Sequence, residues 1–211
     1  METLNFIKRN KFLLVACFVT FMVTFAATSY ATTYSYKWYN VGGGWIYLAA
    51  NGDNLSSDYT GNSNFDAGIN KWYSSGGPIS IGTTSFSNSD VDFLTVSSTT
   101  WNNNGWGNGE AWTQPYSSSG ACVSTPNFAN PETKCSNATI TYAAIYTNGG
   151  NVSTSDSRKR AVLAHEIGHA VGLAHQQYIP AQGSSIMTQN LGGGYNVSSY
   201  DISEVKNKYN F

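Results

Sequence analysis

Short segments of the first two thirds of the chain are apolar or alternate between apolar and polar residues, and glycine- and serine-rich stretches separate them. Such segments predict β-strands, because successive side chains of a strand point to opposite faces of the sheet. We expect them to pair in one sheet. The candidate strands are residues 34–39, 45–50, 78–82, 91–96 and 138–146.

A helical period appears between the second and third of these segments. Phe65, Ile69 and Trp72 recur at positions i, i+4 and i+7, which places all three on one side of a helix. Asn62 or Ser63 could cap its first turn by accepting a hydrogen bond from a free backbone N–H group. We therefore expect a helix whose aromatic and aliphatic side packs on the sheet.

Residues 97–134 lose any clear period and are rich in asparagine, glycine and serine. One short piece interrupts this composition, Glu110-Ala111-Trp112-Thr113 after Gly109. We expect a long surface excursion that contains a short strand.

Two helices are predicted near the C-terminus. The first begins at Ser155 or Asp156 and runs to Val171, and its apolar stripe is formed by Leu163, Ile167 and Ala170. The second begins at the capping box Ser198-x-x-Asp201. Its apolar stripe consists of Ile202, Val205 and Tyr209.

The first of these helices contains the pattern H-E-x-x-H-x-x-G-x-x-H at residues 165–175. Residues four apart share a helix face and are separated by about 6 Å of rise, so His165 and His169 can bind one ion. Gly172 allows a sharp turn after the helix, which brings His175 back to the same ion. Glu166 points sideways from the two histidines, within reach of a water on the metal.

This arrangement predicts a catalytic zinc site, because three neutral imidazoles leave the fourth tetrahedral position open for water. Zinc lowers the pKa of such a water toward about 7 and polarises a scissile carbonyl, while Glu166 moves the proton as general base. The five-residue pattern alone also occurs by chance, but here all three histidines of the chain occupy ligand positions. We predict a zinc endopeptidase that acts on protein or peptide substrates.

Two other functions remain open. A non-catalytic surface or adhesive domain would fit the loops rich in asparagine, tyrosine and glycine, although such a domain has no need to keep Glu166. Hydrolysis of a non-peptide amide would use the same metal and the same base. Digestion of casein with and without a chelator separates these alternatives.

Residues 1–31 have the character of a signal peptide. Lys8, Arg9 and Lys11 precede an apolar run, and residues 29–31 place small side chains where a signal peptidase cleaves. We expect a secreted catalytic domain of residues 32–211, without stable membrane association after cleavage. A lipoprotein cleavage at Cys17 and an uncleaved anchor are weaker alternatives, since the apolar run continues beyond Cys17 yet is shorter than the roughly twenty residues that span a bilayer.

Removal of the signal would leave two cysteines, Cys122 and Cys135. In an exported protein we expect them to form one disulfide that closes a surface loop, worth about 3 kcal/mol, rather than two free thiols. They lack the C-x-x-C spacing of zinc ligands.

Charge argues against some partners. Removal of residues 1–31 takes three basic residues and one acidic residue from totals of 11 and 12, which leaves a net charge of −3. We expect no nucleic-acid binding, because no basic patch is visible, and we expect a monomer.

Calcium could bind through loop aspartates, but no acidic ligand spacing supports it. The aspartates concerned are Asp53, Asp58, Asp66, Asp90 and Asp92.

The chain resembles the matrixin branch of the metzincin zinc peptidases. The resemblance rests on residues 165–175, on Ser185-Ile186-Met187, which matches the methionine turn beneath the metal, and on the S-x-x-D-I-x-x-V-x-x-x-Y pattern of residues 198–209. Residues 65–72 resemble the family's first helix. The resemblance to matrixins implies an α+β fold with a five-stranded twisted mixed sheet, about three helices and an active-site cleft across the domain.

The resemblance also assigns roles to other residues. Glu110, Ala111, Trp112 and Thr113 would correspond to the edge strand that pairs with an extended substrate. Gln189 stands two residues after Met187, where astacins and serralysins have a tyrosine, so no tyrosine ligand is expected. No second zinc site built on histidines is expected either.

Overall fold

A mixed, twisted sheet with helices packed on it forms the core of the α+β fold. The computed structural model describes residues 33–122, 135–176, 184–191 and 194–211. The strands are β1 (Lys37–Trp38), β2 (Val41–Gly42), β3 (Trp45–Asn54), β4 (Ile79–Thr83), β5 (Val91–Val96), β6 (Ala111–Ser117), β7 (Gly120–Ala121) and β8 (Thr139–Asn148). The predicted signal peptide, residues 1–31, lies outside the described residues.

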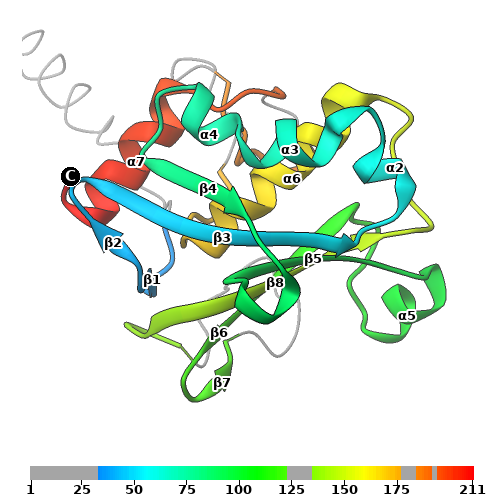
Figure 1. Cartoon of the computed structure of the whole chain (residues 1–211), viewed down its shortest axis with the longest axis horizontal. Helices are drawn as coiled ribbons and strands as arrows, with labels where there is room; N and C mark the ends of the chain where they lie inside the picture. Colours follow the sequence, from blue (N-terminus) through cyan, green and yellow to red (C-terminus); the bar gives the residue numbers. More distant parts are fainter. Residues whose placement is uncertain (1–32, 123–134, 177–183, 192–193) are drawn as a thin grey trace, which may run out of the picture. The chain divides into compact units, whose positions relative to one another are not determined.

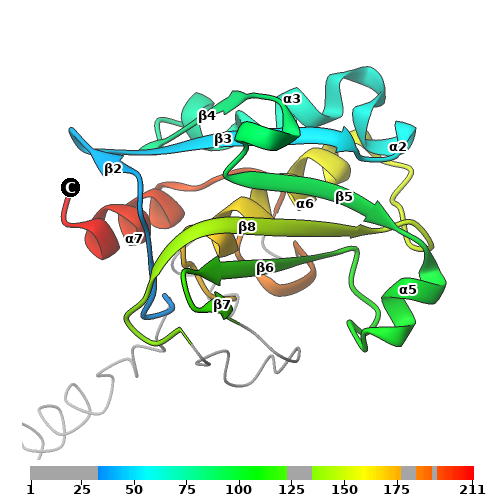
Figure 2. The same ribbon diagram turned by 60° about the horizontal axis from the view of Figure 1, so that its bottom comes forward.

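The five long strands lie in the order β4-β3-β5-β8-β6 (Figure 2). The short strands β1, β2 and β7 pair with β8, β3 and β6, respectively. Strands β3 and β4, β3 and β5, and β5 and β8 pair in parallel, whereas β6 pairs with β8 antiparallel. Strand β6 is therefore the one long strand that runs against the others, and it lies near an edge of the sheet.

The helices differ greatly in length. They are α2 (Ser57–Thr60), α3 (Asn64–Ile69), α4 (Lys71–Ser74), α5 (Ser98–Asn103), α6 (Asp156–Ala170) and α7 (Ser199–Tyr209), with 3₁₀ turns η1 (Gly61–Ser63), η2 (Phe86–Asn88) and η4 (Gln189–Leu191). Helices α3, α4 and α6 lie on the same side of the sheet (Figure 1). None of the helices in the described part of the chain has the length and apolar composition needed to cross a bilayer.

The prediction of an α+β fold with a mixed twisted sheet is confirmed, but the predicted set of strands is partly wrong. Residues 34–39 contribute only the two-residue strand β1, because Tyr34 pairs its N–H with Gly172 O at 2.8 Å instead of continuing along the sheet. Residues 111–117, expected to be loop with a short strand, form the full strand β6. Its buried positions include Thr113, Pro115 and Ser117, so hydrophobic alternation does not reveal it.

The single helix predicted around Phe65 is broken into pieces. Asn62 and Ser63 both have φ of 53°, in the left-handed region, so they separate η1 from α3, and the boundary between α3 and α4 falls at Asn70. Ser63 stands at the N-cap of α3 but makes no side-chain capping bond. The predicted apolar side is correct, since Phe65, Ile69 and Trp72 are all buried.

Helix α5 was missed because it contains a single buried apolar residue, Trp101, and so has no period to detect. Its start is marked by Ser97, whose side chain accepts a hydrogen bond from Thr100 N. The starts of the two long helices are as predicted. Ser155 caps α6 by accepting from Arg158 N, and Ser198 and Asp201 form a reciprocal capping box at α7.

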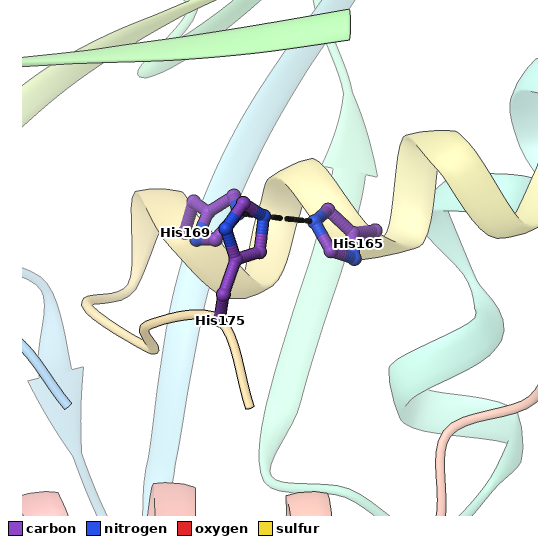
Figure 3. Close-up of side chains that lie close together, drawn as sticks. All are labelled: His165, His169 and His175. Atoms are coloured by element: carbon purple, nitrogen blue, oxygen red, sulfur yellow. Dashed lines mark hydrogen bonds between the residues drawn. The ribbon is translucent and has the colours of Figure 1, made fainter. Parts of the chain in front are cut away.

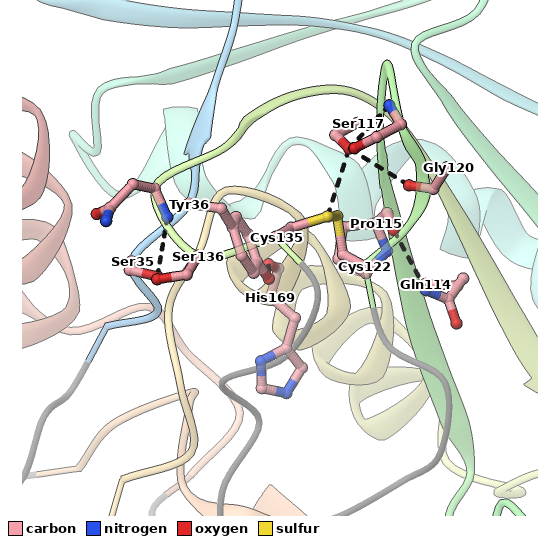
Figure 4. Close-up of a disulfide and its surroundings, with 12 residues drawn as sticks. Ser35, Tyr36, Gln114, Pro115, Ser117, Gly120, Cys122, Cys135, Ser136 and His169 are labelled. Atoms are coloured by element: carbon pink, nitrogen blue, oxygen red, sulfur yellow. Dashed lines mark hydrogen bonds between the residues drawn. A yellow bond between two sulfur atoms is a disulfide. The ribbon is translucent and has the colours of Figure 1, made fainter.

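Cys122 and Cys135 are joined in a disulfide, as the sequence predicts (Figure 4). Tyr36 and His169 lie close to this bond in the same view. The residues between Cys122 and Cys135 that would form the closed loop, 123–134, lie outside the described part of the chain.

Candidate metal centre and active-site cleft

Three histidine side chains converge at the end of helix α6. His165 and His169 project from its last two turns, and His175 approaches from the segment after the helix (Figure 3). Their Nε2 atoms are 3.0 Å apart for His165 and His169, 3.1 Å for His165 and His175, and 3.1 Å for His169 and His175. Among the described residues, no other group of three or more histidine, cysteine, aspartate or glutamate ligand atoms is close enough to hold one ion.

The hydrogen bonds on the far side of the rings decide which nitrogens are available. His165 Nδ1 lies 2.6 Å from Ile186 O, and His169 Nδ1 lies 2.8 Å from Leu173 O. A carbonyl oxygen can only accept a hydrogen bond, so in both rings the proton is on Nδ1 and Nε2 carries a lone pair. These lone pairs face one another across about 3 Å, so a cation bound between them would offset their mutual repulsion.

The donor set fits zinc. Three nitrogens that bind one tetrahedral zinc at about 2.0–2.1 Å would be roughly 3.3 Å apart, close to the spacing of this triad. Neutral imidazole nitrogen is a donor that zinc prefers, and three protein ligands leave one coordination position open.

Burial keeps the three rings unprotonated. It lowers the pKa of His165 to about 4, although the bond to Ile186 O opposes this shift. Burial and the neighbouring His165 lower the pKa of His175 to about 3, and burial, His175 and His165 place that of His169 well below its usual value of 6.5. The triad is therefore neutral at pH 7, the state in which imidazole binds a metal.

We predict that the metal-free protein loses stability on acidification. Below pH 6.5 the unfolded chain protonates its three histidines, but the folded chain does not until about pH 4, so the unfolded state binds more protons. Glu166, whose pKa is raised in the folded state, opposes this trend between about pH 7 and 4.5, but it is one group against three. The free energy of unfolding of chelated protein, measured by denaturant titration, should fall between pH 6.5 and 4.

A His175→Gln variant provides the control, because it removes one of the three groups and should weaken the pH dependence. A free energy of unfolding that rises or stays level over this pH range would contradict the burial of three neutral histidines.

The turn after α6 depends on Gly172, as predicted from the sequence. Gly172 has φ of 91°, its N–H donates to His169 O at 2.9 Å, and Leu173 N donates to Gly168 O at 2.8 Å. These bonds close the helix and send the chain back toward the triad. Leu173 O then accepts a hydrogen bond from His169 Nδ1, which fixes that ring as well.

An N-terminal segment supports the same turn, which the sequence did not reveal. Thr33 pairs with Leu173 in an isolated antiparallel bridge, and Tyr36 donates its hydroxyl hydrogen to His169 O at 2.7 Å. The Tyr34 ring stacks on Tyr36 and lies 6.1 Å from the His169 ring, centroid to centroid. Aromatic residues so far from the zinc-binding pattern give no sequence signal of this contact.

Residues 185–187 lie directly against the helix that carries the histidines. Met187 is fully buried, and its sulfur fills the space that a side chain at Gly168 would need. Ile186 contributes the carbonyl that binds the His165 ring. This segment therefore orients one histidine and packs an apolar side chain against Gly168 of the same helix.

Asp201 connects that segment to helix α7. It is fully buried, and its carboxylate accepts hydrogen bonds from Ser185 Oγ at 2.5 Å, Ile186 N at 3.1 Å and Ser198 N at 2.8 Å. The sequence predicted only its capping role. The structure shows that the same carboxylate also holds the backbone of Ile186, whose carbonyl contacts the His165 ring.

We predict that Asp201→Asn destabilises the protein by about 2–4 kcal/mol, because an amide nitrogen would face hydrogen-bond donors and one charged acceptor would be lost. Thermal unfolding of purified variants measures this. Asp66→Asn, at an exposed position in the first turn of α3, is the matched control and should change stability by less than about 0.5 kcal/mol. Equal melting temperatures for both variants would refute the role of Asp201.

Glu166 is buried beside the triad and lines the adjoining cleft. Burial raises the pKa of its carboxyl to about 7, and a hydrogen bond from Thr113 opposes the shift. The Thr113 hydroxyl lies 2.6 Å from Glu166 Oε2. A carboxyl group with a pKa near neutrality, next to a metal centre, can both accept and release a proton.

A pocket opens next to the triad. Of the four residues predicted to bind substrate, Glu110 and Ala111 line it, whereas Thr113 points toward Glu166 and Trp112, the adjacent residue of the strand, faces the other side of the sheet. Glu110 is held by Arg158, whose Nε donates to Glu110 Oε2 at 2.7 Å. The lining residues within the described part of the chain are Trp106, Gly109, Glu110, Ala111, Val162, His165, Glu166, His175, Gln189 and Leu191.

Several of these lining residues were not predicted. Val162 precedes His165 by three positions on the same helix, so helical spacing alone could have identified it. Trp106, Gln189 and Leu191 come from loops and turns without a readable pattern.

Strand β6 presents backbone groups to this cleft. Glu110 O accepts a hydrogen bond from Asn148 N on β8, and Pro115 O accepts one from Cys122 N on the opposite side. Because backbone groups of successive residues in a strand point to alternate sides, the N–H and C=O of Ala111 and Thr113 face away from β8. Among the described residues no strand pairs with β6 on this outer side at these two positions.

Three of the five aspartates considered for calcium accept hydrogen bonds within the fold. Asp90 accepts from Tyr39 Oη and from Ala49 N, and Asp92 accepts from Ser89 Oγ and Tyr142 Oη. Asp53 accepts from the Asn51 side chain. These contacts give the carboxylates partners within the protein, and calcium remains without support.

Comparison with protein families finds no match to this sequence, and comparison with curated proteins finds none either. Solved structures similar to this chain include high choriolytic enzyme 1, a hatching enzyme zinc-protease of the medaka fish Oryzias latipes, at 16% identity and a TM-score of 0.43, covering 82% of this chain and 94% of that chain. Two structures of myroilysin are similar at 14% identity, with TM-scores of 0.42 and 0.44, covering 86% and 82% of this chain and 92% and 81% of theirs. At such identities and TM-scores, we base no inference about activity on these similarities.

Proposed function

We propose that this chain is a zinc-dependent endopeptidase of the metzincin type that resembles the matrixins. The observation that carries the proposal is the convergence of three histidine Nε2 atoms at 3.0–3.1 Å from one another beside a buried glutamate. His165, His169 and His175 are the zinc ligands, Glu166 is the general base, and Met187 supports them from below.

The reaction follows from the positions of the chain's own groups. Zinc in this site supplies a Lewis acid that polarises the substrate carbonyl and lowers the pKa of water. Glu166 accepts the proton of the attacking water and passes it to the departing amine, which its raised pKa favours. The carboxylate is then ready for another cycle.

Substrate binding is assigned to the edge strand. An extended peptide can pair with the outward N–H and C=O groups of Ala111 and Thr113, which would hold the scissile bond beside the triad. The pocket between Trp106, Val162 and Leu191 is positioned to receive one substrate side chain.

The biological setting belongs to the same proposal. Cleavage of residues 1–31 would release a secreted domain of residues 32–211, stabilised by the Cys122–Cys135 disulfide. We propose that it acts as a monomer on protein or peptide substrates and not on nucleic acids.

Digestion of casein by purified residues 32–211 tests the function. Cleavage should stop when a chelator is added and return when zinc is restored. An inert protein that nevertheless binds zinc would favour the surface or adhesive alternative. Chelator-sensitive turnover of small amides without cleavage of casein would favour a non-peptide amidase.

A further inference from the structure

Thr113 contacts two parts of the proposed active site at once. Its backbone N–H and C=O face the open side of β6, where the proposal places the substrate. Its side chain is buried and projects out of the plane of the sheet, toward helix α6. There the hydroxyl lies 2.6 Å from Glu166 Oε2 and 3.0 Å from Glu166 O.

The shorter of these contacts constrains the carboxylate. A threonine hydroxyl has a single hydrogen to donate, and an ionised carboxylate accepts it more strongly than a peptide carbonyl does. One oxygen of Glu166 is therefore engaged by β6. Among the described residues the structure gives Oε1 no hydrogen-bond partner, so this second oxygen is left to meet a water in the cleft.

We propose that Thr113 is a positioning residue that couples the substrate-binding strand to the general base. The hydroxyl fixes the rotation of the Glu166 carboxylate, and the backbone of the same residue pairs with the substrate. Any displacement of β6 then moves the substrate and the base together. The inference rests on the proposed function and adds a residue to its machinery.

Another buried threonine of the sheet offers a matched comparison. Thr147 on β8 is fully buried, and its hydroxyl bonds with Thr95 Oγ1 at 2.7 Å and with Leu94 O at 3.3 Å. Its loss would remove a buried hydroxyl from the same sheet without touching Glu166. Effects of buried hydroxyl loss in general can thus be separated from effects on the base.

The test compares three variants of residues 32–211: Thr113→Val, Thr113→Ser and Thr147→Val. Valine keeps the shape and the backbone of threonine, so in Thr113→Val we expect kcat to fall about 10- to 100-fold with KM within about twofold, as for loss of a hydrogen bond to a charged group. Thr113→Ser should restore most of kcat. Thr147→Val should keep kcat within about threefold, whatever its melting temperature.

A crystal structure of Thr113→Val provides a readout that does not depend on turnover. The Glu166 carboxylate should rotate away from its wild-type position, with the three histidine rings and the zinc content unchanged. An unrotated carboxylate, or a kcat equal to that of wild type, would overturn the inference and leave the peptidase assignment intact. An inactive wild-type protein would instead refute the proposed function itself.

Discussion

Glu166→Gln should abolish detectable peptide cleavage while the protein still binds one zinc per chain. Glutamine has nearly the same shape, so it can fill the buried site beside the triad, but its amide cannot accept the proton of the attacking water. General-base catalysis contributes on the order of 10²–10⁴-fold, and we expect kcat to fall by about 10³-fold or more. Initial rates on a fluorogenic peptide and metal analysis of the same preparation measure both quantities.

Glu204→Gln is the matched control for this change, since Glu204 lies on helix α7 outside the pocket lining. It should keep the wild-type kcat. Turnover in Glu166→Gln close to that of the control would show that another group acts as the base.

Gly172→Ala should destabilise the protein by about 2–4 kcal/mol and weaken zinc binding as well. A φ of 91° strains any residue with a side chain, and a Cβ there would lie 2.9 Å from the backbone oxygen of Tyr36. The N-terminal segment and the turn would have to separate, which displaces His175 from the other two ligands. Thermal unfolding and a zinc-chelator competition assay measure the two effects.

Gly76→Ala isolates the conformational part of this effect. Gly76 has φ of 78°, but no atom lies within 4 Å of the position a Cβ would take, so only backbone strain of about 1–2 kcal/mol is expected and zinc affinity should not change. Equal losses of stability and of zinc affinity in the two variants would mean that the contact with Tyr36 has no role at the turn.

The parts of the fold that local sequence determines were predicted well. The caps at Ser155 and Ser198 involve groups within one helical turn, and the zinc-binding pattern spans eleven residues, so spacing alone places its members. The left-handed residue Gly172 follows from the same local pattern. In each case the partner lies within about ten positions of the residue concerned.

The parts that depend on distant partners were predicted poorly. Strand β6 is defined by its pairing with β8 and buries polar residues such as Thr113, so its own pattern is ambiguous. Residues 34–39 gave an alternating strand pattern, but tertiary contacts of Thr33 with Leu173 and of Tyr36 with His169 place the start of this segment beside the histidine triad. Tertiary contact overrides local propensity at such positions.

The same distinction applies to the candidate site. The three histidines and Glu166 could be identified from one stretch, whereas the Thr113 hydroxyl bond and the role of Asp201 beside Ile186 join residues far apart in sequence. Sequence reasoning placed Thr113 at the substrate and Asp201 at a cap. In the structure, Thr113 also contacts Glu166, and Asp201 also contacts Ile186.

A crystal of residues 32–211, measured on both sides of the zinc absorption edge, tests the central claim most directly. The account predicts one anomalous peak per chain, about 2.0–2.1 Å from the Nε2 atoms of His165, His169 and His175. The absence of a peak after soaking in zinc, or a peak elsewhere with the three rings turned apart, would contradict it.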